Sequence, residues 1–298
     1  ALLNLSGYLK LGTDERQAIA ASLRYFTFGE VTMSEQGSGD VQMITNPYEM
    51  AFDVSYSRKL SESYSMAVAL RYIRSDQGAD ATDERVPGNA FAADVAGYLE
   101  KYVILGNAEA LWSFGFNISN IGTKISYDSG ATNQFLPTKL AIGTGLLYPL
   151  DDYNEIGVYV DISKYLVPSE PQMTGTTEED IQDYNDAVDE YNTMSPITGM
   201  FKSFGDSPLG FKGEMQEIMA SIGLEYSYNQ QFFVRGGYYY ENQNMGNRQY
   251  FSFGAGFRMS VFQLDAAYLL STVQSNPLDQ TLRFSLSFDM DGIKNLFR

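Results

Sequence analysis

The side chains that could do chemistry in this chain are carboxylates, arginines and hydroxyls, because the sequence contains no histidine and no cysteine. Without cysteine there is no thiol nucleophile and no disulfide. Without histidine there is no histidine-based triad and no histidine metal site. Many hydrolase, redox and zinc chemistries are thereby excluded. The formal net charge of −17 also argues against nucleic acid as a partner, because a polyanion repels phosphates.

Three short patterns resemble binding motifs, but each lacks the features that would make it one. Gly254-Ala255-Gly256 has neither the third glycine nor the following helix of a nucleotide loop, and is interpreted as strand glycine. Asn117-Ile118-Ser119 matches a glycosylation sequon but falls inside a predicted strand. The acids at 178–180 lack the spacing of a calcium loop. We therefore predict no catalytic residue, no metal and no cofactor.

Charged residues recur in the middle of segments with a strong apolar side, and in many of these segments the charge falls on the opposite side. A soluble β-sandwich has no need of so many arginines in mid-strand, whereas the polar interior of a membrane barrel can hold them paired with acids. The predicted interior set is Arg24, Arg71, Arg235, Arg258 and Arg283 together with Asp53, Asp94, Asp161, Glu225 and Asp265.

The elements that carry these charges alternate between apolar and polar residues over about ten residues, the length a tilted strand needs to cross a bilayer. In 48–57, for example, Tyr48, Met50 and Phe52 share one side, while Glu49 and Asp53 lie on the other. The pattern predicts thirteen strands, at 2–11, 17–31, 48–59, 64–75, 89–100, 108–118, 136–148, 153–164, 215–228, 231–241, 248–258, 261–271 and 279–290.

The predicted fold class is an all-β transmembrane antiparallel β-barrel, in contact with outer-membrane lipid and forming one domain over 1–298. A soluble all-β protein is the alternative, because its strands also alternate. The connections decide against it: short turns such as Asn229-Gln230 alternate with long loops, as periplasmic turns and extracellular loops do. Bacterial barrels close with an even number of strands, so we expect at least one strand before Ala1, and about fourteen strands in all.

The connection at 165–213 is too long for a simple loop. Thr177 and Asp180 have the spacing of a capping box, and Ile181, Tyr184 and Val188 follow at helical spacing. We predict a short helix there, within a long extracellular loop.

An apolar stretch punctuated by glycine and proline follows this helix. Exposed apolar side chains of this number mark a partner site, although the stretch could instead fold back over the mouth of the barrel. The candidate partner-binding residues are Ile197, Met200, Phe201, Phe204, Leu209 and Phe211.

Several stretches resemble a known family. The best is Trp112-Ser113-Phe114-Gly115-Phe116-Asn117-Ile118-Ser119-Asn120-Ile121-Gly122, followed by Phe135-Leu136-Pro137-Thr138-Lys139-Leu140-Ala141-Ile142-Gly143. A second is Arg16-Gln17-Ala18-Ile19-Ala20-Ala21-Ser22-Leu23-Arg24-Tyr25-Phe26. These stretches and the strand layout resemble the PorV/PorQ group of FadL-like barrels from Bacteroidetes.

This resemblance implies a fourteen-stranded outer-membrane barrel without enzymatic activity, working in type IX protein secretion. It also implies an N-terminal segment before Ala1. Its implied partners are the SprA-type translocon, cargo proteins bound through their C-terminal signal domains, and a PorU-like attachment complex at the cell surface. The alternatives are a FadL-type transporter of hydrophobic small molecules and a structural barrel or general porin. Strand alternation does not say whether the interior is open.

Overall fold

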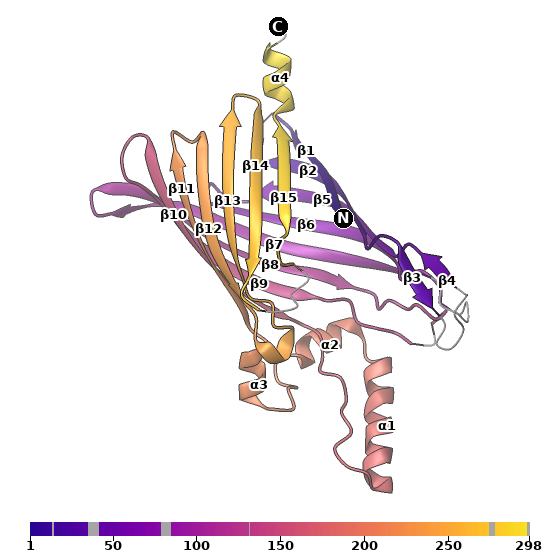
Figure 1. Ribbon diagram of the computed structural model, residues 1–298. Coiled ribbons are helices and arrows are strands. Elements are labelled where there is room, and N and C mark those ends of the chain that lie inside the picture. The colour runs from indigo at the N-terminus through magenta and orange to yellow at the C-terminus, as the bar shows by residue number, and fades with distance from the viewer. Residues whose placement is uncertain (14, 35–41, 79–84, 131, 274–277, 297–298) are drawn as a thin grey trace. The chain divides into compact units, whose positions relative to one another are not determined.

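The computed structural model describes residues 1–298 apart from 14, 35–41, 79–84, 131, 274–277 and 297–298. Thirteen strands form one sheet in the order β1-β2-β5-β6-β7-β8-β9-β10-β11-β12-β13-β14-β15, so that neighbours in the sheet are neighbours in the chain (Figure 1). The bounds are Leu2–Leu11 (β1), Gln17–Thr27 (β2), Tyr48–Lys59 (β5), Tyr64–Asp76 (β6), Gly88–Leu105 (β7), Ala108–Gly122 (β8), Lys139–Pro149 (β9), Asn154–Tyr165 (β10), Met219–Tyr228 (β11), Phe232–Tyr240 (β12), Tyr250–Met259 (β13), Phe262–Ser271 (β14) and Leu282–Phe288 (β15).

All thirteen predicted strands are confirmed, as is the all-β antiparallel fold class. The second predicted strand, 17–31, ends earlier, at Thr27. Residues beyond it form a separate hairpin of β3 (Val31–Ser34) and β4 (Gln42–Thr45), which was not predicted. Among the described residues, β1 and β15 each pair on one side only, so the sheet is open rather than closed.

The apolar side chains of the strands are exposed, which is the reverse of a water-soluble core. Phe52, Leu70 and Phe284 are 45%, 67% and 70% exposed, whereas Asp53, directly after Phe52, is only 8% exposed. Leaving one such apolar side chain in water forgoes about 1.5–3 kcal/mol of burial free energy. A sheet with a whole apolar face of this kind is therefore stable against lipid and not against water, which excludes the soluble alternative.

The short turns are closed by local polar contacts. Asn229 and Gln230 have φ values of 52° and 53°, the left-handed conformation that tight hairpin turns use at their central residues. The Gln231 N–H closes this turn by donating to the Tyr228 carbonyl at 3.0 Å. In the β9–β10 turn, the Asp151 carboxylate accepts hydrogen bonds from the backbone N–H groups of Tyr153 and Asn154, at 2.8 and 2.9 Å. These bonds favour the charged form and lower the pKa of Asp151.

Three helices lie in the β10–β11 connection: α1 (Glu178–Thr193), α2 (Pro196–Lys202) and α3 (Phe211–Gln216). The 3-10 turn η1 (Gln243–Met245) lies between β12 and β13, and α4 (Met290–Leu296) follows β15. None of the described helices is long and apolar enough to span a membrane. The predicted helix and capping box are confirmed: Thr177 Oγ1 accepts from the Asp180 N–H at 3.2 Å, and the Thr177 N–H donates to Asp180 at 2.9 Å. The contacts with Thr177 also lower the pKa of Asp180.

The chain divides into two compact units, 1–97 with 117–140 and 165–210, and 98–116 with 141–164 and 211–298. The first unit contains a small apolar core, formed by Ala90 and Ala92 of β7 with Ile125 and Leu136 of the β8–β9 connection. That 1–298 forms a single domain stays a prediction.

Candidate functional site

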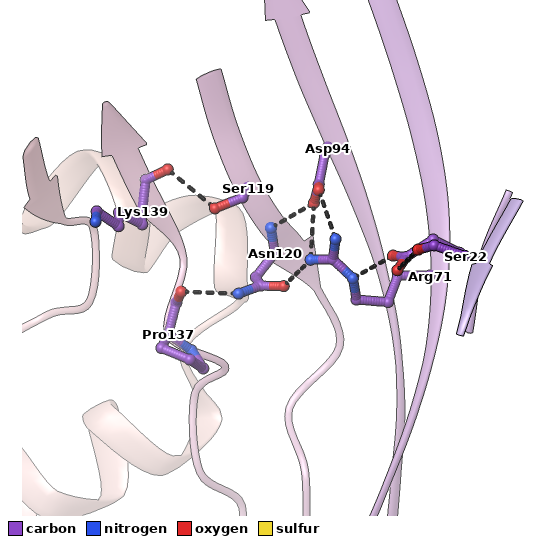
Figure 2. Close-up of polar contacts among 8 residues, drawn as sticks. Ser22, Arg71, Asp94, Ser119, Asn120, Pro137 and Lys139 are labelled. Carbon is purple, nitrogen blue, oxygen red and sulfur yellow. Dashed lines mark hydrogen bonds and ion pairs between the residues drawn. The ribbon is translucent and has the colours of Figure 1, made fainter. Parts of the chain in front are cut away.

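The first unit contains a cluster of polar side chains centred on Arg71, which we call the Arg71 cluster: Ser22, Asp53, Arg71, Asp94 and Asn120. Figure 2 shows Ser22, Arg71, Asp94 and Asn120 of this cluster. Strand register brings Asp53 directly opposite Ser22 and Arg71. The guanidinium of Arg71 donates to Asp53 and to the Asn120 side chain, and to both oxygens of Asp94 at 3.3 and 2.8 Å. Ser22 donates to the second oxygen of Asp53 at 2.9 Å. Every charged group is thus paired within the cluster.

Asn120 connects this cluster to the long connections. Its φ of 60° is in the left-handed region, which a non-glycine residue adopts only at some cost in free energy. Its N–H donates to Asp94 at 2.8 Å, and its side-chain amide donates to the carbonyl of Pro137 at 3.2 Å (Figure 2). Its own carbonyl accepts from the Thr138 hydroxyl at 2.7 Å. The Thr138 carbonyl in turn accepts from the Leu166 N–H, where the 165–213 connection begins.

The second unit has its own arginine-centred cluster, the Arg235 cluster: Glu225, Arg235 and Asp265. Glu225 and Arg235 are opposite in the register of β11 and β12, and are joined at 2.5 Å. Arg235 also reaches across β13 to Asp265 at 2.6 Å. Where the Arg235 side chain crosses β13, that strand has glycines at 254 and 256. A Cβ on Gly256 would lie 2.3 Å from the Asp265 carboxylate. The motif Gly254-Ala255-Gly256 is strand glycine, as predicted.

The other predicted interior charges have different surroundings. Arg258 donates to Gln263 at 2.8 Å and lies 5.3 Å from the Phe233 ring centroid. Asp161 accepts from Ser221 at 3.3 Å. Arg24 and Arg283 are exposed, and within the described part of the chain no ion pair joins either of them to an acid of the predicted set. That all ten charges line an enclosed interior stays a prediction.

The 165–213 connection is fixed to the first unit by Lys124, which follows β8. Its ammonium donates to the carbonyls of Tyr191 and Asn192, at 2.9 and 3.0 Å, and lies 4.0 Å from the Phe135 ring centroid. These carbonyls belong to the last turn of α1, where backbone acceptors lack partners within the helix and a cation is favoured. α1 has no basic residue of its own in that turn, so Lys124 supplies the charge. Burial lowers the pKa of Lys124.

α2 is held by close packing of its buried side. A Cβ on Gly199 would lie 2.9 Å from Phe135 and 3.1 Å from Pro168, so only glycine fits at this contact. Ser195 caps the helix, accepting from the Thr198 N–H at 3.1 Å. Beyond α2, Asp206 accepts from the Ser169 N–H at 2.8 Å and joins the two ends of the segment.

Five of the six predicted partner-binding residues are exposed. Within the first unit, Phe201 is 73% exposed, and Ile197, Phe204 and Leu209 are exposed by more than half, while Met200 is half-buried. Phe211, at the start of α3, is exposed and belongs to the second unit. Four of the six residues lie on α2 or within two residues of its end. The sequence did not predict α2 or α3 as helices. With 7 and 6 residues, each is too short for apolar residues to recur at helical spacing.

Sequence reasoning missed the neutral and glycine partners of these sites. Asn120 is inside the stretch that carries the family resemblance. Nothing in its residue type predicts that it has a left-handed backbone conformation or that it connects several hydrogen-bonded groups. Lys124 was not singled out because its partners are 67 and 68 residues away. The spacing of Gly254 and Gly256, two residues apart in a strand, is the one local signal that could have indicated a side chain passing overhead.

Comparison with known proteins gives one family. The family model described as type IX secretion system protein PorV matches residues 2–172, more than half of the chain. No curated protein sequence matches the chain.

Among solved structures, the Pseudomonas putida toluene transporter TodX is similar at 10% identity and a TM-score of 0.46, over 95% of this chain and 79% of that one. The Ralstonia pickettii toluene transporter TbuX is similar at 10% identity and 0.38, over 95% and 78%. BamA from Haemophilus ducreyi, lacking POTRA domains 1–3, is similar at 11% and 0.39, over 96% and 62%. Likeness at this level is too distant to indicate a function.

Proposed function

We propose a function from one premise: the chain belongs to the PorV family of type IX secretion system proteins. The protein is accordingly an outer-membrane component of a protein secretion system, from a family of secretion proteins rather than enzymes. This confirms the resemblance and the outer-membrane location predicted from the sequence. The exposed apolar strand faces fit that location.

Within this system, we propose that the protein acts by binding. It takes cargo by the C-terminal signal domain at an SprA-type translocon, and delivers it to a PorU-like attachment complex at the cell surface. No residue in this proposal performs a chemical step. In the Arg71 and Arg235 clusters each carboxylate is hydrogen-bonded to the central arginine, which suits a structural role in holding the strands together.

The observation that carries the proposal is the exposure of the aromatic side chains on and after α2, on a segment that is otherwise tied down. Phe201 and Phe204 are 73% and 54% exposed, although α2 itself is packed through Gly199 and the adjoining α1 is bound by Lys124. Aromatic side chains held in place lose little conformational entropy on binding, and such residues dominate the free energy of protein interfaces. The apolar side of a signal domain or of the translocon is the matching partner surface.

A double substitution tests this role. Phe201→Ala with Phe204→Ala removes both exposed rings and leaves Gly199, Lys124 and the strands untouched. We expect recovery of the translocon or of a cargo signal domain in pull-downs to fall about tenfold or more, as it does when central aromatic residues of an interface are truncated. The matched control is Ile181→Ala, which removes another exposed apolar side chain from the same connection, on α1.

Unchanged recovery of both partners with the double variant would exclude the α2 segment as the binding surface. Equal losses with Ile181→Ala would show that the connection responds to any apolar truncation. The broader deletion of 170–211 then decides whether the connection is needed at all.

A FadL-type transporter of hydrophobic small molecules is the second candidate, since the fold suits it equally. That function requires an apolar pocket in the barrel wall. The hollow on the polar face of the second unit is lined in part by the charged residues Glu225, Arg235 and Asp265, so it is not an apolar pocket of this kind. Uptake of a radiolabelled hydrocarbon by cells with and without the protein separates the two functions, because a carrier of secreted cargo leaves uptake unchanged.

A further inference from the structure

The polar face of the second unit contains a hollow of about 440 Å³, formed over β10 to β14. Its floor has almost no side chains. Gly223 of β11 is paired with Gly237 of β12, and Gly237 with Ser252 of β13. Gly254 and Ala267 continue this floor to β14. The volume is in the range of small-molecule binding sites in proteins, about 300–1,000 Å³.

The glycine at 223 is not required by the packing of the chain itself. A Cβ there would have only one neighbour within 4 Å, the Cβ of Tyr159 at 3.9 Å, and no positive φ is involved. Glycine inside a strand lowers stability, and it often marks a bulge, a tight bend or a place that a ligand or another backbone approaches closely. The space above Gly223 is thus left open by the fold.

The walls of the hollow are aromatic and negatively charged. Tyr239 and Tyr250 stack with ring centroids 5.1 Å apart at 17°, and Tyr159 stands on the β10 side. The charged walls are Asp161, Glu225, Asp265 and Arg235. Three carboxylates against one guanidinium leave a formal excess of two negative charges (3 − 1 = 2). Arg235 is shared between Glu225 and Asp265, so Asp161 lacks a cationic partner among the lining residues.

We propose that this hollow binds a small organic cation, an ammonium or guanidinium group on a compact apolar body. The acids attract the charge, the faces of the tyrosine rings attract a cation at close range, and the glycine floor accommodates the body. An anion would be repelled. A neutral apolar ligand would cover carboxylates and leave them without water or a counter-charge, which costs free energy. This site is separate from the α2 surface and does not depend on the secretion role.

The test uses the full chain in lipid nanodiscs, titrated with benzylammonium and, in parallel, with its neutral analogue benzyl alcohol. We expect saturable calorimetric binding of benzylammonium, about tenfold tighter than that of benzyl alcohol. Gly223→Leu should abolish it by filling the hollow. Gly7→Leu is the matched control: Gly7 lies in β1 opposite Ala21, its Cβ would have no neighbour within 4 Å, and it does not line the hollow.

Asp161→Asn keeps the shape of the hollow and removes one negative charge, so it should weaken benzylammonium binding several-fold even if Gly223→Leu does not fold. Equal affinity for benzyl alcohol would overturn the proposal in favour of a neutral apolar ligand. No saturable binding of benzylammonium, or an affinity unchanged by Asp161→Asn, would equally overturn it.

Discussion

Gly256 is a residue whose role is set by the side chains that pass over it. Arg235 on β12 reaches Asp265 on β14 at 2.6 Å, and the strand between them must present no side chain at the crossing. A Cβ at 256 would lie 2.3 Å from the Asp265 carboxylate and 3.1 Å from the guanidinium of Arg235. Gly254, two residues earlier, has its nearest neighbours at 3.4 and 3.5 Å, which are ordinary contacts.

This difference predicts opposite outcomes for two identical substitutions. Gly256→Ala should lower the free energy of unfolding by about 1–3 kcal/mol, because the Arg235 cluster must move to admit the methyl group. Gly254→Ala should be close to neutral or slightly stabilising, because alanine suits a strand better than glycine. Urea unfolding in lipid vesicles, followed by the heat-dependent shift in gel mobility, measures both. Equal midpoints for the two variants would mean that the Arg235–Asp265 contact is not formed.

At the scale of elements, α1 is held at its two ends by different kinds of interaction. Its first turn is capped locally by Thr177 and Asp180, which the sequence predicted because capping depends on residues three positions apart. Its last turn depends on Lys124, which lies in the β8–β9 connection, 67 and 68 residues before the carbonyls that it binds. Local chemistry is readable from sequence, whereas such a tertiary contact is not.

Lys124→Met should therefore loosen the C-terminal end of α1 while leaving its start capped. Methionine keeps the apolar stem over Phe135 but removes two charge-assisted hydrogen bonds, each worth about 1.5–3 kcal/mol. We expect limited proteolysis near 191–195 to accelerate at least about tenfold. Lys202→Met is the control, because Lys202 joins the exposed Glu190 in a surface pair of small energetic value. A cleavage rate at 191–195 that is the same for both variants would show that Lys124 does not hold the helix.

At the scale of the whole molecule, period-2 alternation predicted all thirteen strands, because each strand has one apolar side that must face lipid. It could not say which charges meet, since that depends on register between strands. Register places Arg71 opposite Asp53 and Arg235 opposite Glu225. It places Arg24 opposite Asn4 and Ala51, and Arg283 opposite Ala267. The β3–β4 hairpin and the helices α2 and α3 were missed because each is too short for a periodic signal.

The outer-membrane location requires the apolar side of the sheet to face lipid. Because the sequence has no cysteine, which side faces lipid can be measured with cysteines introduced at single positions. Leu70→Cys and Ala69→Cys place a thiol on opposite faces of β6, since Leu70 is 67% exposed and pairs with Val54 while Ala69 pairs with Ser55. Each is labelled with a nitrobenzoxadiazole fluorophore and reconstituted with lipids brominated along their acyl chains. Strong quenching at position 70 and little at position 69 is the predicted result. Equal quenching at the two positions, or stronger quenching at 69, would contradict the orientation on which the outer-membrane account is built.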